Sequence, residues 1–231
     1  VRDPRAVAAS TNATDSKYPW DFLARQWRKL AGLAWYYSHH AAFADRVKLL
    51  RYEDLIFYPE TTTRELCEFL EVEWYPQVAD PGSYGDGGGD QWIQNSTFGS
   101  SGAVFDQQAA TRWRKKLDAK EVGYLEWLCS PDMQLLGYES VDFSQRRLDV
   151  DWAMNPPHIA ETEQAEWMRG VVPSDPLTAR VNAATEILRK NLLYGYQDTN
   201  QDRLPEIVLQ QGLLLEPDLL NDLRNATRRG A

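Results

Sequence analysis

The amino-acid sequence predicts an α/β fold in which helices cover a parallel β-sheet. Residues 47–50 form a short apolar run that does not alternate with polar residues, which is typical of a buried strand in a parallel sheet. Residues 1 and 2 read as the end of an earlier apolar strand. The resulting order of strand, helix, strand and helix favours a layered sheet with right-handed crossovers.

Helices are predicted around these strands. Pro4 suits the first turn of a helix over residues 3–14, where a missing N–H costs nothing. Residues 61–70 have the pattern of an amphipathic helix. Residues 18–44 predict one long helix or two, because apolar residues recur at the three- and four-residue spacing of a buried stripe: Trp20, Leu23, Trp27, Leu30, Leu33, Ala34 and Tyr37.

The later half is less regular. Residues 76–111 are rich in glycine and lack periodicity, which predicts a long loop. Asp118 and Glu121 have the spacing of a capping box that starts a helix, and Gly137 suits a helix stop in the same region. Beyond residue 143 the sequence predicts helices separated by prolines, most clearly at residues 176–194 and 217–228. These features divide the chain into a first domain, 1–144, and a helical extension of unknown role, 145–231.

Composition narrows the class of partner. The net charge of −9 over 231 residues argues against nucleic-acid binding. There is no run of about 18 apolar residues, so no membrane span is predicted. Cys67 and Cys129 fall on apolar helix faces and are expected to be small buried side chains. No Cys/His spacing suggests zinc, and no metal site is predicted.

The first chemical motif is Arg2 followed by Ser10. Eight residues are about two helical turns, so both side chains fall near one face. A guanidinium presents a planar fork of donors and a hydroxyl adds one more, so the pair could hold one phosphate. The alternative is an ordinary surface arginine at a strand-to-helix turn.

Two further motifs follow in order. Residues 51–55 read Arg-Tyr-Glu-Asp-Leu, and residues 112–117 read Arg-Trp-Arg-Lys-Lys-Leu. With the Arg2 motif, their order and spacing closely resemble the later half of a sulfotransferase that uses PAPS (3′-phosphoadenosine 5′-phosphosulfate), over residues 1–143. The resemblance implies a three-layer sandwich with a parallel sheet, that is, a P-loop NTPase-like sulfotransferase fold truncated at its N-terminus.

The resemblance also implies roles for individual residues. Arg2 and Ser10 match the pair that grips the 3′-phosphate of the donor, and Arg112 matches a basic residue that reaches the same phosphate. Tyr52 matches a tyrosine beside the adenine. Either Ser96 or Thr97 matches a hydroxyl that faces the nucleotide in the similar tyrosylprotein sulfotransferases.

Three features around these residues carry further expectations. Trp113 looks like a structural tryptophan of the family. Glu53 and Asp54 are expected to cap the following turn and to accept from backbone N–H groups, rather than to act as paired acids. The loop at 76–111 resembles a stretch that folds over the donor as a mobile lid, the alternative being a surface insertion.

The sequence lacks one part of the family's pattern. The loop that holds the 5′-phosphosulfate, and the His or Glu that acts as base, lie upstream of the Arg2 motif in the family. No Gly-x-x-x-x-Gly-Lys-Ser/Thr occurs in these 231 residues, and the glycine-rich stretch 85–90 contains two acids and no lysine. We therefore expect an inactive fragment that carries half of the donor site, with its catalytic residues unknown.

The sequence thus predicts part of an enzyme that transfers a sulfuryl group from PAPS to a hydroxyl or amine on a small molecule, carbohydrate or protein, releasing PAP (3′-phosphoadenosine 5′-phosphate) without a metal. A P-loop kinase is disfavoured because ATP has no 3′-phosphate. A catalytically inactive nucleotide-binding or adaptor protein is the other alternative. The cytoplasm is the favoured compartment, with the Golgi lumen as the alternative if an N-terminal anchor has been lost.

Overall fold

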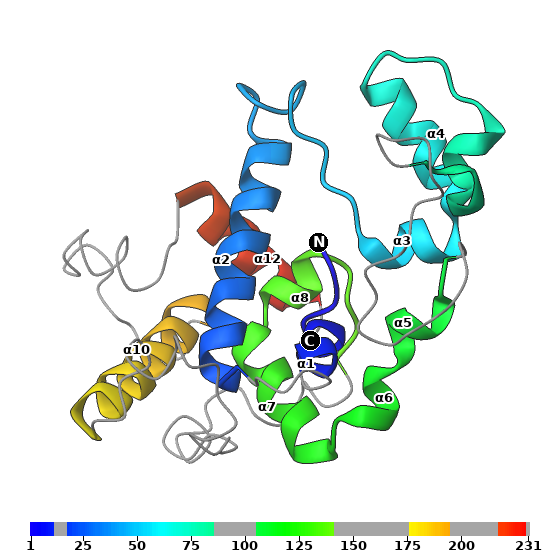
Figure 1. Ribbon diagram of the computed structural model, residues 1–231. Helices are drawn as coiled ribbons and strands as arrows, with labels where there is room; N and C mark the ends of the chain where they lie inside the picture. The colour runs from blue at the N-terminus through cyan, green and yellow to red at the C-terminus, as the bar shows by residue number, and fades with distance from the viewer. Residues whose placement is uncertain (12–17, 86–104, 141–175, 195–216, 230–231) are drawn as a thin grey trace.

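The computed structural model describes residues 1–11, 18–85, 105–140, 176–194 and 217–229. Over these residues the regular elements are helices (Figure 1). The centre of the molecule is formed by α1 (Pro4–Thr11), α2 (Trp20–His39), α7 (Ala119–Cys129) and α8 (Asp132–Leu135).

The predicted parallel sheet, and with it the three-layer P-loop-like sandwich, is wrong for the described part of the chain. The two segments predicted as strands do lie side by side, because the Val1 ammonium donates to the Leu50 carbonyl at 2.6 Å and the Tyr52 N–H donates to the Val1 carbonyl at 2.6 Å. These two bonds make one step of a parallel pairing. A strand needs a ladder of such steps, and residues 47–50 have only this one among the described residues.

The apolar core lies where α1, α2 and α7 meet. The inner face of α1 consists of alanines, of which Ala8 is fully buried, so that neighbouring helices approach its backbone closely. Trp20, Trp27 and Leu128 fill the space around it. Aromatic rings of this size bury large apolar areas and account for much of the stabilisation of a core this small.

The apolar stripe of α2 is only half buried. Trp20, Leu23 and Trp27 lie in the core, as predicted, whereas Leu30 is 64% exposed and Tyr37 is 39% exposed. Figure 1 shows the end of α2 extending beyond α1 and α7. The periodicity identified the helix correctly, but a helix that outruns its packing partners exposes the continuation of the same stripe.

A separate group of helices follows residue 51. It contains α3 (Tyr52–Phe57), α4 (Pro59–Phe69) and two 3₁₀ turns, η1 (Pro76–Ala79) and η2 (Pro81–Ser83). The helix predicted at 61–70 is confirmed as α4, whereas α3 was not predicted. The Trp74 indole N–H donates to the Thr63 hydroxyl at 3.0 Å and ties the chain after α4 back onto it.

The local signals around α7 are confirmed. After α5 (Gln107–Thr111) and α6 (Trp113–Lys116), Asp118 and Glu121 form both hydrogen bonds of a capping box, at 2.8 and 2.9 Å. Gly137 follows α8 with φ of +75°, a backbone conformation that favours glycine. Cys67 and Cys129 are both buried free thiols, as expected.

Two helices of the predicted extension are described, and both pack on the first part of the chain. They are α10 (Pro176–Tyr194) and α12 (Pro217–Arg229), which begin at the predicted prolines. The Leu219 side chain of α12 lies against Gly32 of α2, where an added Cβ would come within 3.2 Å of it. The division at residue 144 stays a prediction. None of the described helices combines the length and apolar character needed to cross a membrane.

Buried charges hold α10 in place. Glu186 accepts from both terminal nitrogens of Arg28 at 2.6 and 2.7 Å, and Arg189 pairs with Asp132. Burial alone raises the pKa of Glu186, but the charge and hydrogen bonds of Arg28, together with the charges of Arg189 and Arg25, outweigh burial and the pKa falls to about 2. Lys190 is fully buried and donates to the Ser130 carbonyl at 2.8 Å. Burial lowers the pKa of Lys190 well below its ordinary value, and the charges of Arg189 and Arg28 lower it further.

A second buried network joins the start of the chain to α7. The Arg5 side chain donates to both oxygens of Asp3, at 2.7 to 3.2 Å, and to Glu126 at 2.5 Å. Its guanidinium carbon lies 4.1 Å from the centre of the Trp113 ring. Only 4% of the Arg5 side chain is exposed. One cation therefore neutralises two buried carboxylates and fixes α1 against α6 and α7.

We predict that Lys190→Met stabilises the protein at neutral pH. The native state holds Lys190 with a lowered pKa, so between that pKa and about 10.4, the ordinary value, the unfolded chain binds more protons and wild-type stability rises with pH. The advantage of the methionine variant should therefore shrink as pH rises through this window. Urea unfolding at several pH values measures it, with exposed Lys120→Met as control.

The Ser130 carbonyl keeps a donor in the methionine variant, because Arg189 also reaches it at 3.1 Å. A Lys190→Met protein that is less stable than wild type at pH 7, with an unchanged pH slope, would contradict the prediction.

We predict that Arg5→Met destabilises the protein by about 3–5 kcal/mol, because it leaves the Asp3 and Glu126 carboxylates buried without their cation. Adding Glu126→Gln should recover part of the loss. Chemical unfolding of the single and double variants tests this, and a single variant as stable as wild type would show that the network adds nothing.

Candidate functional site

Arg2 lies where the start of the chain meets α3 and α5. Its terminal nitrogen donates to the Ala109 carbonyl in α5 at 2.8 Å. Its guanidinium carbon lies 4.7 Å from the centre of the Tyr52 ring. Two of the predicted site residues, Arg2 and Tyr52, are therefore in contact, and both are partly exposed.

The peptide group that joins Arg2 to Asp3 is held by side chains from other elements. The Trp27 indole N–H donates to the Arg2 carbonyl at 2.7 Å. The Asp3 N–H donates to Glu53 at 2.9 Å, and the other Glu53 oxygen accepts from the Tyr138 hydroxyl at 2.9 Å. Burial and the Glu53 charge raise the pKa of Tyr138, so its hydroxyl stays protonated as the donor.

These contacts test what the sequence predicted for Glu53 and Asp54. Glu53 does accept a backbone N–H, as expected, but from Asp3 rather than from its own turn. Asp54 lies 3.8 Å from Arg51, and α3 has no side-chain cap. Trp27 and Tyr138 were not predicted as part of the site, because each looks in sequence like an ordinary core aromatic.

One N–H donor of the Arg2 side chain is not used in a hydrogen bond. The Arg2 Nε is buried and has no hydrogen-bond partner among the described residues. An unpaired buried N–H is unfavourable by an amount comparable to a lost hydrogen bond, and charged donors are the most demanding. An anionic oxygen bound at this point would satisfy it.

Arg112 occupies the junction between α5 and α6. One helical turn separates it from Ala109, the residue that Arg2 contacts. Its side chain pairs with Asp106 at 2.8 Å, and 21% of that side chain is exposed. Asp106 also caps α5 by accepting from the Gln108 N–H at 2.9 Å. A carboxylate therefore shares the place where Arg112 would meet a phosphate.

Ser10 lies in the last turns of α1 and is partly buried. The hydrogen bond given for Arg2 goes to Ala109, not to Ser10, so the structure does not join this pair directly. The start of α1 carries its own acid, because Asp3 accepts from the Arg5 N–H at 2.8 Å. Any anion near Arg2 is therefore recognised by side chains rather than by this helix end.

The remaining predicted residues, Ser96 and Thr97, lie outside the described residues, as does most of the predicted lid. Trp113 is buried, and the guanidinium of Arg5 and that of Arg114 both contact its ring, at 4.1 and 4.6 Å. Among the described residues no three His, Cys, Asp or Glu side chains are grouped to hold a metal ion.

A mainly apolar cavity of about 470 Å³ opens beside Arg2. Its walls come from the first residues of the chain and from α2, and include Val1, Tyr18, Phe22 and Leu30. The exposed part of the α2 stripe thus faces a hollow next to the Arg2 backbone. Arg2 is the charged side chain in the lining of this cavity.

Comparison with known proteins finds similarity to sulfotransferases over part of the chain. Residues 1–76 match the model of the sulfotransferase family. Carbohydrate sulfotransferase 5 of Mus musculus is 33% identical over 119 residues, which are 46% of this chain and 27% of that protein. Carbohydrate sulfotransferase 1 of Danio rerio is 33% identical over 106 residues, which are 42% of this chain and 23% of that protein.

A third relative, carbohydrate sulfotransferase 3 of Tetronarce californica, is 28% identical over 166 residues, 61% of this chain and 35% of that protein. No solved structure matches. The chain thus spans about a quarter to a third of the length of these relatives. The matched segment 1–76 contains Arg2, Ser10 and Tyr52, and over this segment the chain is similar to the sulfotransferase family.

Proposed function

We propose that this chain carries the 3′-phosphate and adenine half of a PAPS site, in an enzyme that transfers a sulfuryl group to a hydroxyl or amine acceptor. The observation that carries the proposal is the state of Arg2. Its backbone is held by Trp27 and Glu53, its guanidinium lies on Tyr52, and its buried Nε has no partner among the described residues.

The chemistry of Arg2 suits a phosphate. A guanidinium presents several donors in one plane, and a phosphate accepts two of them at once. Such charge-assisted bonds contribute about 1.5–3 kcal/mol each. The Tyr52 ring, already below the guanidinium, offers an aromatic surface to a purine at the same place. Arg112, one turn beyond Ala109, is the second cation that we assign to the phosphate.

In this proposal the chain binds and orients the donor. Sulfuryl transfer, like phosphoryl transfer, depends on in-line positioning and on stabilising charge in the transition state. Ser10 and either Ser96 or Thr97 would add hydroxyl donors to the bound nucleotide. Since residues 1–231 contain no Gly-x-x-x-x-Gly-Lys-Ser/Thr, we expect them to bind donor or product without turnover on their own.

The acceptor class follows from the relatives. The three relatives are named as carbohydrate sulfotransferases, so we propose a carbohydrate hydroxyl as the acceptor of the enzyme to which this chain belongs. A kinase-like protein would prefer ADP over PAP, since only PAP carries a 3′-phosphate. Calorimetric titration with both nucleotides separates the two functions, and equal affinity would remove the case for PAPS.

We predict that Arg2→Ala weakens PAP binding by about 1.5–3 kcal/mol, the size of a lost charge-assisted contact. Binding of adenosine 5′-phosphosulfate, which lacks the 3′-phosphate, should change far less. Arg2→Lys should recover part of the loss, because an ammonium cannot reproduce the planar fork. Calorimetry on the chain gives all these values.

Arg46→Ala is the matched control, since Arg46 is an exposed arginine in the turn that follows α2. It makes the same change in net charge and should leave both affinities unaltered. Equal losses for the two nucleotides in Arg2→Ala would mean that Arg2 supports the fold and does not read the phosphate.

We predict that Asp106→Asn strengthens PAP binding. Asparagine is as good an N-cap as aspartate, so α5 should persist, while Arg112 loses its competing carboxylate. Exposed ion pairs contribute up to about 1 kcal/mol, so the gain should be about fivefold at most. Calorimetry tests it, and unchanged affinity would place Arg112 outside the phosphate site.

A further inference from the structure

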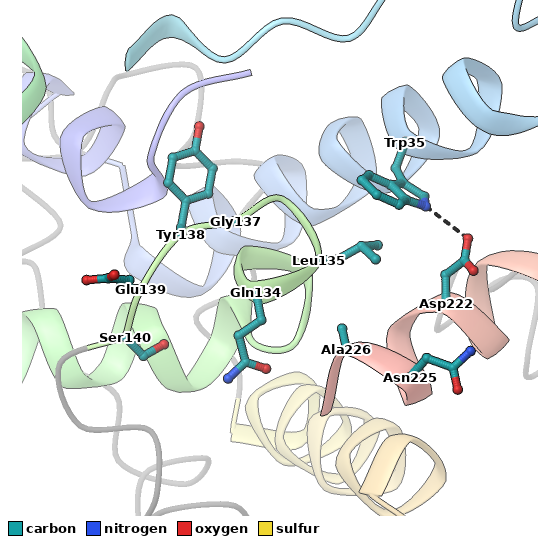
Figure 2. Close-up of a pocket in the computed structure, with 10 residues that line it drawn as sticks. All are labelled: Trp35, Gln134, Leu135, Gly137, Tyr138, Glu139, Ser140, Asp222, Asn225 and Ala226. Atoms are coloured by element: carbon teal, nitrogen blue, oxygen red, sulfur yellow. Dashed lines mark hydrogen bonds between the residues drawn. The ribbon is translucent and has the colours of Figure 1, made fainter. Parts of the chain in front are cut away.

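A second cavity has Tyr138 in its lining and shares no lining residue with the cavity beside Arg2. It has a volume of about 600 Å³ and is walled by three separate stretches of chain: Trp35 of α2, residues 134–140 at and after α8, and one face of α12 (Figure 2). The Trp35 indole N–H donates to Asp222 at 2.9 Å and closes the wall between α2 and α12. The residues assigned to the 3′-phosphate, Arg2, Ser10 and Arg112, do not line this cavity.

The polar groups of its lining include two carboxylates, which can only accept, and amide and hydroxyl groups, which can accept as well as donate. Glu139 and Asp222 are carboxylates, and Asp222 uses only one oxygen on Trp35 in the bonds given. The Gln134 Oε1 and the Ser140 hydroxyl oxygen are buried and have no hydrogen-bond partner among the described residues. Asn225 adds an amide from α12. Unpaired buried acceptors are unfavourable, and a ligand rich in N–H donors would satisfy them.

The charge of the lining has one sign. Among the described residues that line the cavity, two are acidic and none is a lysine or arginine. Arg51 contacts two residues of the lining: its guanidinium carbon lies 4.6 Å from the centre of the Tyr138 ring, and it donates to the Gly137 carbonyl. The Asp54 carboxylate lies 3.8 Å from the Arg51 Nε. Carboxylates gathered in a concave, partly apolar site concentrate cations.

The apolar part of the lining indicates that the cation is an organic molecule rather than a metal ion. Trp35, Leu135, Tyr138 and Ala226 supply apolar wall between the polar groups. A small hydrated metal ion has no use for such a surface, and the described residues offer no group of three ligands for one. An aliphatic chain that ends in ammonium groups would use both kinds of wall.

We propose that this cavity binds an organic cation, a primary ammonium carried on an aliphatic chain, with Asp222 and Glu139 as counter-ions and Gln134 and Ser140 as further acceptors. Each ammonium brings three N–H donors, which matches the surplus of acceptors. The apolar wall covers the methylene groups. This proposal does not rest on the PAPS proposal, because none of the residues assigned to the nucleotide lines this cavity.

The test uses 1,5-diaminopentane as the probe and 1,5-pentanediol as its uncharged counterpart, titrated by calorimetry into the full chain. The diamine should bind with a stoichiometry of one, and the diol should show no binding. Asp222→Asn with Glu139→Gln should weaken diamine binding about tenfold, because charge-assisted hydrogen bonds become neutral ones. Asparagine can still accept from Trp35, so the wall should persist.

The matched control is Asp45→Asn with Glu68→Gln, which makes the same change in charge at two exposed positions. It should bind the diamine as wild type does. Equal weakening in both double variants would mean that the probe responds only to the acidic surface as a whole and would overturn the proposal.

A second variant tests whether the diamine binds inside this cavity, without changing any charge. Ala226→Leu narrows the cavity without altering a polar group and should lower the affinity for the diamine. Circular dichroism and thermal unfolding check that each variant is folded. Undiminished diamine binding by the folded leucine variant, or binding of the diol as tight as that of the diamine, would also overturn the proposal.

Discussion

The arrangement of the proposed donor site depends on the buried cation Arg5. It neutralises Asp3 on its own helix end and Glu126 on α7, and its guanidinium lies on the Trp113 ring. Asp3 is next to Arg2, and Trp113 is next to Arg112. The same guanidinium therefore fixes the neighbours of both arginines that we assign to the 3′-phosphate. Burial makes the arrangement rigid, because removing any member leaves a charge without its partner.

Arg2 itself is held by contacts outside that network. The single parallel step between Val1 and residues 50–52 sets the chain direction, Trp27 takes the Arg2 carbonyl, and Glu53 takes the Asp3 N–H. These bonds fix the backbone on both sides of Arg2, and none of them uses the Arg2 side chain itself. A binding group whose position is set in advance loses less entropy when its ligand arrives.

Glu53 and Tyr138 also connect the two cavities of the molecule. The Tyr138 hydroxyl donates to Glu53, which holds Asp3 beside Arg2, while the same residue lines the cavity that α12 closes. The helices α10 and α12 therefore pack on the first part of the chain. Through Arg28, Glu186 and Asp222 they complete surfaces that begin in the segment matched to the sulfotransferase family.

Local sequence signals predicted the helices and their ends well. The capping box at Asp118, the stop at Gly137 and the prolines that open α10 and α12 depend on a few neighbouring residues, so the sequence alone determines them. The sheet prediction failed because a strand depends on distant partners, and among the described residues the segment 47–50 has a single step of strand pairing, with Val1. For the same reason the exposure of Leu30 could not be read from its periodicity.

The candidate site was likewise predicted in part from the sequence and in part seen only in the structure. The motifs at residues 2, 52 and 112 pointed to the sulfotransferase family and to a phosphate, because residue type and order carry that information. Only the tertiary structure showed that Arg2 lies on Tyr52, that Asp106 pairs with Arg112, and that Trp27 and Tyr138 donate hydrogen bonds to the Arg2 carbonyl and to Glu53. Each of these joins residues far apart in sequence or depends on side-chain direction, and folding alone decides which of them meet.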